Sequence, residues 1–559
     1  MSRARDARDR DAGDRYARDP AAVERALCSP RFLTLLVLIG VALRIWAYAA
    51  NTSLALDEIL LSRNILGLPL RDLLTQPLEL DQVAPRGFLL VEKLAILAFG
   101  EHELALRLFP FLCGIAALVL FRRLAERALD GLAVPFAIAL FALGIPFVSY
   151  AVQVKQYMVD VAATILLVHL ALGLRAQAAS TRHLLLVGLL GWIVFWFSQA
   201  SVVVMAGIGT ALGIEWLVTR NRSTARVLLI TMPLWATAAV VAVVAGLRSM
   251  TPSTREFMDD FWRTGFFPLP LQSPAQLRWF WDQSMSVFTD PTLLRYPWPA
   301  AYLLLAIVGV VALWRRRRDV AFVLLGPVAV ALLAAIAHQY PFRGRLMLYL
   351  LPVFVLAMGG GAEWVRHAVS RMSPALGVGA MAALLAPPVV TLAGTLPPYE
   401  IEHTRTMLAY LQKNRLPGDV VHVFPLSRIG VLFYESQYGL TRGDWTTAAC
   451  DRNDTRTYIR DVDRYRGVRR LWVLSRRNPA FRTAYASVRE YLGTIGVRRA
   501  SLSRVSLTGG AISLDLYDLS DQTRLASANA ETFPVPPMPT DPRPGCRPWV
   551  RPSPLDDFR

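Results

Sequence analysis

The sequence predicts an α-helical polytopic membrane protein that ends in a C-terminal α/β domain. Apolar residues make up 54% of the 559 residues, and the mean hydropathy is +0.38. Long apolar runs recur between residues 32 and 395, after which the pattern changes to that of a soluble unit. Soluble globular proteins rarely combine this hydropathy with runs of membrane-spanning length.

The formal net charge of +18 comes from arginines that lie mostly in short clusters between the apolar runs. Such clusters act as topology signals, because cytoplasmic loops carry the positive excess. We therefore interpret the charge as an orientation signal and expect no nucleic-acid partner. The four cysteines form no closely spaced Cys/His set, so neither a zinc module nor a CxxC redox pair is supported.

The membrane domain is predicted at residues 32–395. Residues 1–31 precede it and mix Arg and Asp with little apolar content, which is typical of a disordered cytoplasmic tail and not of a cleaved signal peptide. About eleven runs have the length that a spanning helix needs. The predicted spans are 32–50, 104–121, 131–149, 158–174, 183–199, 201–218, 227–247, 300–314, 320–338, 346–362 and 375–395.

The segment GFLLVEKLAILAFG at 87–100 is short for a span and carries Glu92 and Lys93 near its middle. If it does not span, every arginine cluster between the apolar runs falls on the same side of the membrane as the Arg-rich N-terminus, as the positive-inside rule expects. We therefore predict a re-entrant or membrane-surface helix, which is tolerated where it packs against protein. The resulting odd number of spans places residues 396–559 outside the cytoplasm.

Residues 396–559 are predicted to form an extracytoplasmic α/β domain with a Pro-rich tail. Helical patterns in IEHTRTMLAYLQKN, RIGVLFYESQYG and FRTAYASVREYLGTIG alternate with the strand-like VVHVFPL, RRLWVLS and AISLDLYDL. Cys450 and Cys546 in this domain either pair in an oxidising compartment or stay two separate thiols. The domain contains no catalytic motif, so we expect an accessory role for it.

Three basic residues lie on the outer side of the membrane in this topology. Lys155, Arg343 and Arg345 oppose the positive-inside bias, and each precedes a helix whose N-terminal end favours anions. A bound phosphate would compensate both the unfavourable outer position of these cations and their unfavourable place at the positive end of a helix dipole. Alternatively, the side chains reach lipid headgroups or pair with acids such as Asp160.

Asp57 and Glu58 stand side by side just beyond the first span, in the first outer loop at 51–103. Asp57 suits the N-cap of the helix EILLSRNILGL, and Glu58 would then be a first-turn acid that favours the helix dipole. Carboxylates that face several cations at a membrane mouth also suit acid/base chemistry on a phosphate-linked substrate. Adjacent helical residues point about 100° apart, so we expect the two acids to have different roles.

Five motifs follow one another on this outer side. They are the acidic pair, AP-x-GF at 84–88, FG-x-x-E-x-ALRL at 99–108, VKQYMVD at 154–160 and YPFRGRL at 340–346. Together they resemble the GT-C glycosyltransferases, in particular the protein O-mannosyltransferase and aminoarabinose transferase group and its bacterial relatives. The resemblance covers roughly residues 32–362 and implies a multi-pass enzyme of the cell membrane, either inner or plasma membrane.

This resemblance implies an inverting glycosyltransferase that moves a sugar from a polyprenyl-phosphate-linked donor to an extracytoplasmic acceptor, which is a cell-envelope glycan, a lipid or a protein. Asp57 matches the general base of the family. Glu58 matches the second acid, which positions the acceptor or helps to hold a metal. The resemblance identifies no cofactor, and it leaves open whether the reaction uses a divalent metal ion. The leaving phosphate would be held by Lys155, Tyr157, Arg343 and Arg345.

Supporting roles around this site are expected for Glu92, Lys93, Glu103, Arg107 and Tyr340. Glu103 and Arg107 lie four apart on one helix face, where a purely structural pair is the competing explanation. His338 is either a metal ligand or plain structure. The aromatic loop at 248–299 either lines a lipid or sugar path or forms an interfacial belt.

A transporter or flippase for a lipid-linked glycan is the alternative function. Transporters more naturally place ionisable residues near the bilayer midplane and show paired halves. Here these residues cluster at one face, and no paired halves are evident. A membrane scaffold whose outer domain binds a partner is a third hypothesis, but it leaves the acids and cations without a purpose. We therefore expect a glycosyltransferase whose partners are its donor, its acceptor and membrane lipids.

Overall fold

The computed structural model describes residues 20–176, 179–448, 454–477 and 482–536, and the chain divides into two compact units. One unit comprises residues 1–51 and 64–398, and the other comprises residues 52–63 and 399–559. The short segment 52–63, which we predicted as part of the first loop of the membrane domain, therefore belongs to the same unit as the C-terminal domain.

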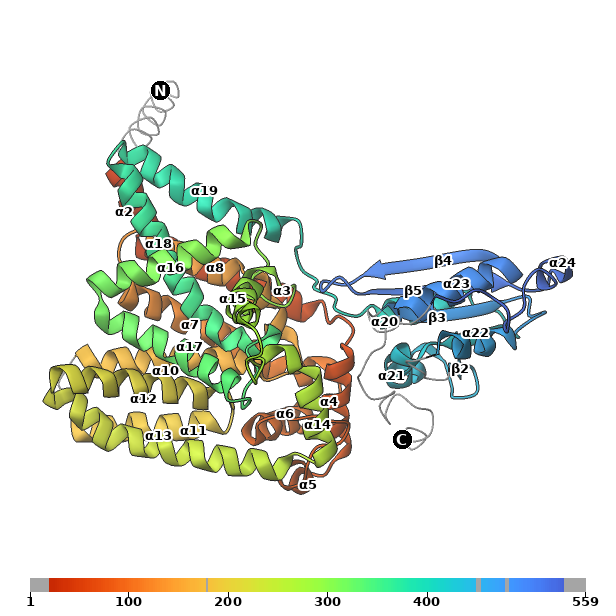
Figure 1. Cartoon of the computed structure of the whole chain (residues 1–559), viewed down its shortest axis with the longest axis horizontal. Coiled ribbons are helices and arrows are strands. Elements are labelled where there is room, and N and C mark those ends of the chain that lie inside the picture. Colours follow the sequence, from red (N-terminus) through yellow and green to blue (C-terminus); the bar gives the residue numbers. More distant parts are fainter. Residues whose placement is uncertain (1–19, 177–178, 449–453, 478–481, 537–559) are drawn as a thin grey trace, which may run out of the picture. The chain divides into compact units, whose positions relative to one another are not determined.

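The first unit is a bundle of apolar helices (Figure 1). Among the described residues, nine helices are long and apolar enough to cross a membrane. They are α3 (Pro30–Ala49), α7 (Glu103–Ala128), α10 (Tyr157–Ala176), α12 (Ser201–Thr219), α13 (Arg222–Ser249), α16 (Pro299–Arg316), α17 (Arg318–Ile336), η4 (Gly344–Leu350) continued by α18 (Leu351–Ser370), and α19 (Pro374–Ala393). The chain is therefore a multi-pass membrane protein, as its composition predicts.

The two remaining predicted spans correspond to shorter helices. The run at 183–199 forms α11 (Thr181–Phe195), and the run at 131–149 forms α8 (Ala133–Leu143) followed by α9 (Ile145–Ser149). This pair is bent by 51°. Gly144 and Pro146 lie at the bend, where the proline lacks the N–H that a continuous helix would use. Each predicted span thus coincides with a helix or a bent helix pair, but among the described residues nine helices, or ten with the bent pair, are long enough to span, against the eleven predicted.

Shorter elements lie between these helices. They are α4 (Leu56–Gly67), α5 (Leu70–Thr75), α6 (Arg86–Phe99), η1 (Tyr150–Val152), α14 (Pro252–Phe261), η2 (Arg263–Gly265), η3 (Pro274–Leu277) and α15 (Arg278–Thr289). Helix α6 is the segment that we predicted not to span, and its 14 residues are fewer than a span needs. The Gly87 amide donates to the carbonyl oxygen of Trp196 at 2.7 Å, and a Cβ at Gly87 would meet that oxygen. The glycine of AP-x-GF is therefore needed for a close backbone approach.

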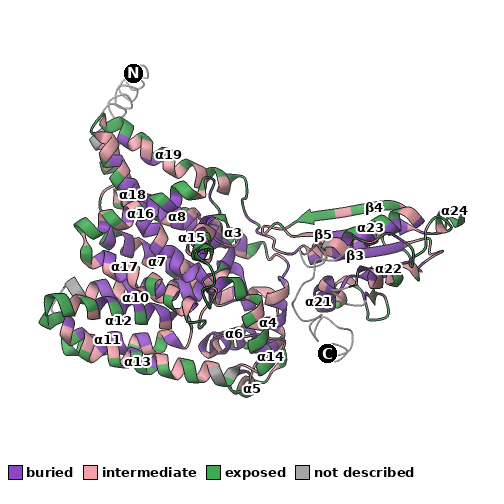
Figure 2. Cartoon of the chain, in the orientation of Figure 1, coloured by how far each residue is buried: buried purple, intermediate pink, exposed green. Residues whose placement is uncertain are grey.

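Close helix packing in the bundle also depends on small residues. A Cβ on Gly309 of α16 would collide with the carbonyl oxygen of Ala357, and one on Gly361 of α18 with that of Leu305. Because the hydrophobic effect does not drive helix association within lipid, such close approach lets van der Waals contacts hold the helices together. Helix α8 lies deep in this packing, whereas α19 is largely unburied (Figure 2).

One segment near the N-terminus departs from our prediction. Residues 20–27, which we expected in a disordered tail, form α2 (Pro20–Leu27). Glu24 of this helix lies 3.2 Å from Arg366 of α18, which also pairs with Glu363 at 2.5 Å. Residues 1–19 lie outside the described part of the chain, as do Cys450 and Cys546. Cys28 and Cys113 are free thiols.

The second unit contains a five-stranded mixed sheet in the order β2-β1-β3-β5-β4 (Figure 1). Its strands are β1 (Val420–Val423), β2 (Thr446–Thr447), β3 (Leu471–Arg477), β4 (Val497–Val505) and β5 (Ala511–Asp518). Strand β1 pairs in parallel with β2 and β3, and β5 runs antiparallel to β3 and β4. The sequence predicts β1, β3 and β5, but not the edge strands β2 and β4.

Helices cover both faces of this sheet. They are α20 (Thr404–Asn414), α21 (Pro425–Tyr434), η5 (Glu435–Tyr438), α22 (Thr455–Asp463), α23 (Arg482–Ile495) and α24 (Gln522–Leu525). Leu471 and Val473 share a core cluster with α22 and α23, whereas Trp472 contacts Tyr410 of α20 with ring centroids 6.2 Å apart. Side chains alternate across a strand, so β3 is buried on both faces (Figure 2).

Candidate functional site

Two of the residues predicted to bind phosphate meet in the first unit. Tyr157 begins α10, and Arg345 lies in η4, which packs against α10. The guanidinium carbon of Arg345 is 5.6 Å from the centroid of the Tyr157 ring and 5.8 Å from that of the Trp262 ring. Such cation–π contacts fix the direction of the guanidinium group.

Lys155 lies two residues before Tyr157 and is buried. Its ammonium group donates to the side-chain oxygen of Gln82 at 2.8 Å. A buried ammonium group needs polar partners to stay charged, and Gln82, which precedes α6, supplies one of them. Lys155, Tyr157 and Arg345 thus form a basic and aromatic cluster at the start of α10, which we call the α10 cluster.

Arg343 has different contacts from Arg345. It donates to the hydroxyl of Thr264 and, with His338 and the long loop, lines a cavity of about 980 Å³. Gly344 separates the two arginines at φ +53°, a backbone conformation that glycine adopts readily. The 248–299 loop therefore supplies most of a cavity that has one of the predicted phosphate ligands in its wall.

Two side chains before these arginines have structural partners. His338 Nε2 lies 2.8 Å from the carbonyl oxygen of Phe267, and its ring stacks on Phe266. The Tyr340 hydroxyl donates to the carbonyl oxygen of Leu346 at 3.1 Å and thereby braces η4. In the described ranges, no group of three or more His, Cys, Asp or Glu side chains is placed to hold a metal ion. These contacts favour plain structure over metal binding for His338.

The other predicted supporting residues differ in their surroundings. Lys93 donates to the carbonyl oxygens of Ile65 and Leu66 at 2.8 and 3.2 Å, where a cation complements the C-terminal end of α4. Arg107 is buried on α7 with Glu103 at the start of the same helix, and it donates to Asn51 at 3.2 Å. Glu92 of α6 is fully buried, and neither carboxylate oxygen has a hydrogen-bond partner among the described residues.

The acidic pair lies in the first turn of α4, and its two members differ in burial. Glu58 is 1% exposed, and its carboxylate accepts the Ala55 amide at 2.9 Å. This bond resembles the backward half of a capping box, so Glu58 closes the start of the helix. Asp57 is only partly buried. The capping role that the sequence suggested for Asp57 is therefore filled in part by Glu58.

The C-terminal domain holds the backbone that leads into this pair. The Leu54 amide donates to the Tyr434 hydroxyl at 2.8 Å, and the Leu56 amide donates to the Glu402 carboxylate at 2.8 Å. Upstream, the Ser53 hydroxyl donates to Glu400 at 3.2 Å. Amides near a helix start lack intrahelical partners, and these side chains satisfy two of them.

Glu402 is itself buried, which raises the pKa of its carboxyl group. Arg476 at 2.5 Å and the Leu56 amide act in the opposite direction, while the charges of Asp57 and Glu58 raise the pKa further. Sequence reasoning missed Glu402 and Tyr434. A side chain that binds backbone several hundred residues away produces no periodic pattern.

The fold and these sites define a multi-pass membrane protein that has a cationic aromatic cluster beside a loop cavity, and whose α/β domain supports an acidic helix start. No protein-family model and no curated protein matches the sequence. Several solved structures align with this chain.

The apo oligosaccharyltransferase of Archaeoglobus fulgidus aligns with a TM-score of 0.48 and 10% identity, over 84% of this chain and 73% of that chain. ArnT from Cupriavidus metallidurans bound to undecaprenyl phosphate aligns with a TM-score of 0.46 and 10% identity, over 87% and 98%. The archaeal oligosaccharyltransferase AglB from Archaeoglobus fulgidus, in complex with an inhibitory peptide and a dolichol-phosphate, gives 0.43 and 12%, over 88% and 74%. At such identities the activity of this chain has to be inferred from its own residues.

Replacing Glu402 tests whether the domain fixes the acidic segment. Glu402→Ala leaves the Leu56 amide without its acceptor, so hydrogen–deuterium exchange of a peptide covering residues 52–58 should speed up by about tenfold. Glu531→Ala is the matched control, because it breaks an exposed ion pair with Arg460 on the same domain. Equal protection in the two variants would contradict the anchoring role.

A pH dependence should follow from His403. Its Nδ1 lies 2.6 Å from Glu400, and the hydrogen bond to that carboxylate raises the imidazole pKa above its ordinary value of 6.5, despite opposing effects of burial and Arg504. The folded state therefore binds the proton more tightly than the unfolded state does. This stabilisation is complete below the ordinary pKa and is lost as the pH rises through the raised value.

The melting temperature of the purified protein should therefore contain a component that falls as the pH rises above about 6.5 and that His403→Gln removes. Differential scanning fluorimetry at constant ionic strength measures it. If the melting temperature depends on pH equally in the wild-type protein and in His403→Gln, the His403–Glu400 pair does not contribute to this pH dependence.

Proposed function

We propose that the chain is an inverting glycosyltransferase of the GT-C type, which moves a sugar from a polyprenyl-phosphate-linked donor to an acceptor outside the cytoplasm. The observation that carries this proposal is the α10 cluster, in which Arg345 lies over the Tyr157 ring and the buried Lys155 precedes that tyrosine by two residues. Arg343 in the wall of the adjoining cavity adds a further cation. This arrangement suits a ligand with a phosphate head and a sugar.

The α10 cluster suits a leaving phosphate because negative charge grows on it as the glycosidic bond breaks. Cations that are already fixed in place stabilise that charge without reorganising. Tyr157 and Trp262 fix Arg345, and Gln82 fixes Lys155, which supports such preorganisation. The apolar helices around the cluster suit the polyprenyl chain of the carrier.

Asp57 is the proposed general base. It takes the proton from the acceptor hydroxyl as that oxygen attacks the anomeric carbon, while the bond to the carrier phosphate breaks on the opposite face, so the configuration inverts. The partial exposure of Asp57 supports this role, since a buried acid would have no access to an acceptor. Glu58 serves the reaction indirectly by closing the start of α4.

The proposed setting is a cell membrane that the chain crosses several times, with the N-terminus in the cytoplasm and the C-terminal unit outside. The distribution of the arginine clusters supports this orientation. The acceptor is a glycan, lipid or protein of the cell envelope.

Replacing the base should stop the chemistry. Asp57→Asn keeps the size of the side chain but removes its basicity, so sugar transfer should fall by at least about a hundredfold. The assay follows labelled sugar from a polyprenyl-phosphate donor to envelope acceptors, using purified protein in liposomes. Asp72→Asn on the neighbouring helix α5 is the control. Near-normal turnover by Asp57→Asn would refute the assignment.

Replacing the cations should weaken the binding of the carrier. Arg345→Gln and Lys155→Gln each remove one positive charge, so the Kd for polyprenyl phosphate should rise by about tenfold, while binding of the uncharged polyprenol should not change. Arg122→Gln, which breaks an exposed pair with Glu126, serves as the control. An unchanged affinity in both cluster variants would exclude the phosphate role.

A further inference from the structure

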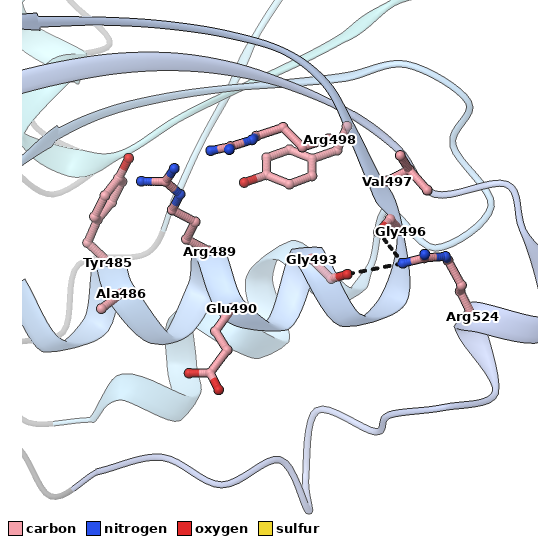
Figure 3. A pocket seen from close by; sticks show the side chains of 10 residues that line it. Tyr485, Ala486, Arg489, Glu490, Gly493, Gly496, Val497, Arg498 and Arg524 are labelled. Carbon is pink, nitrogen blue, oxygen red and sulfur yellow. Dashed lines mark hydrogen bonds between the residues drawn. The ribbon is translucent and has the colours of Figure 1, made fainter.

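The C-terminal domain contains a hollow that the proposed reaction does not use. Its volume is about 680 Å³, within the range of small-ligand pockets, and it lies between α23, the start of β4 and α24 (Figure 3). The side chains that define its chemistry are Tyr485, Arg489, Arg498, Tyr517 and Arg524.

Two guanidinium groups share this hollow. Arg489 extends from α23 and Arg498 from the start of β4, and both point into the space between helix and strand, whereas Glu490 points to the other side of the helix (Figure 3). The nearest acid to Arg498 is Asp515, at 3.7 Å. Arg489 has no hydrogen bond or ion pair within the described ranges. Two like charges repel each other, and a bound anion would remove that repulsion.

Other arginines of this domain show what a satisfied guanidinium group looks like. Arg415 and Arg470 each lie within 2.7 Å of an aspartate. Arg524, at the edge of the hollow, donates to the carbonyl oxygens of Gly493 and Gly496 at 3.3 and 3.1 Å and so caps α23 (Figure 3). Among the described residues Arg489 has neither kind of partner, and because it is exposed its guanidinium group is hydrated, so a bound anion would replace water.

The floor of the hollow is aromatic. Tyr485 and Tyr517 are 6% and 2% exposed, and the Tyr485 hydroxyl is hydrogen-bonded to Ser513. Only a small part of each ring therefore borders the hollow. This lining suits a sugar that carries an acidic group, because a guanidinium fork matches carboxylate and phosphate geometry while the ring atoms add a small apolar contact.

We propose that this hollow binds an acidic sugar residue, with Arg489 and Arg498 contacting its carboxylate or phosphate. The site then selects acceptor glycans that are anionic. Its assignment to the acceptor rests on the proposed glycosyltransferase function, whereas the binding of an acidic saccharide depends only on the hollow.

Binding to the purified full-length protein in detergent tests this inference. Isothermal titration calorimetry with trigalacturonate should show saturable binding that weakens with added salt, whereas the neutral maltotriose should not bind. Arg489→Ala combined with Arg498→Ala should raise the Kd for trigalacturonate by at least about tenfold. Arg499→Ala is the matched control, because Arg499 is the chain neighbour of Arg498 but pairs with Asp518 at 3.0 Å.

Four results would overturn the inference. The first three are no binding of trigalacturonate by the wild-type protein, equal affinity in the double variant, and equal binding of maltotriose. Inorganic phosphate forms a further arm, because an affinity as high as that of trigalacturonate would show recognition of a bare anion and not of a saccharide. Asp57→Asn should bind trigalacturonate normally. If the wild-type protein binds trigalacturonate but transfers no sugar, the proposed function alone is refuted.

Discussion

The hydrogen bond from the Leu56 amide to Glu402 fixes the backbone directly before Asp57. Keeping the Glu402 carboxylate charged there costs free energy, because Glu402 is buried and the acids Asp57 and Glu58 directly follow Leu56. Arg476 offsets the cost by pairing with Glu402. The start of α4 thus depends on a charge balance supplied by the C-terminal domain, and a domain that the sequence marked as accessory becomes part of the support of the proposed base.

Positive charge in the first unit is held by different means. Lys155 contacts the amide oxygen of Gln82, and Arg345 lies over the rings of Tyr157 and Trp262, and these contacts orient the two cations. Glu402 and Arg476 instead neutralise each other. A residue that keeps a backbone segment in place works best with its charge cancelled, whereas the proposed phosphate ligands work best when their direction is fixed before the anion binds.

The sequence predicts those parts of the structure that follow from local patterns. Apolar run length is a direct requirement of the bilayer, so most predicted spans coincide with helices of spanning length, α11 being the shortest exception. VKQYMVD and YPFRGRL likewise indicated residues that meet in space, because Tyr157 and Arg345 do lie together. The different partners of Arg343 and Arg345 were not predictable, since Arg343 contacts Thr264 and Arg345 contacts Tyr157 and Trp262 across a glycine with a positive φ angle. Strand β4 was missed because its exposed, arginine-rich edge lacks the apolar alternation of a buried strand.

The joining of residues 52–63 with residues 399–559 in one compact unit also concerns the order in which the protein is made. Leu56 and Glu402 are 346 residues apart, so the ribosome has synthesised almost the whole helical bundle before the partner of Leu56 exists. Domains fold as units during synthesis, and contacts between distant residues form late. The first turn of α4 therefore reaches its final environment only after the last span has been synthesised. The proposed base is then among the last parts of the protein to be fixed in place.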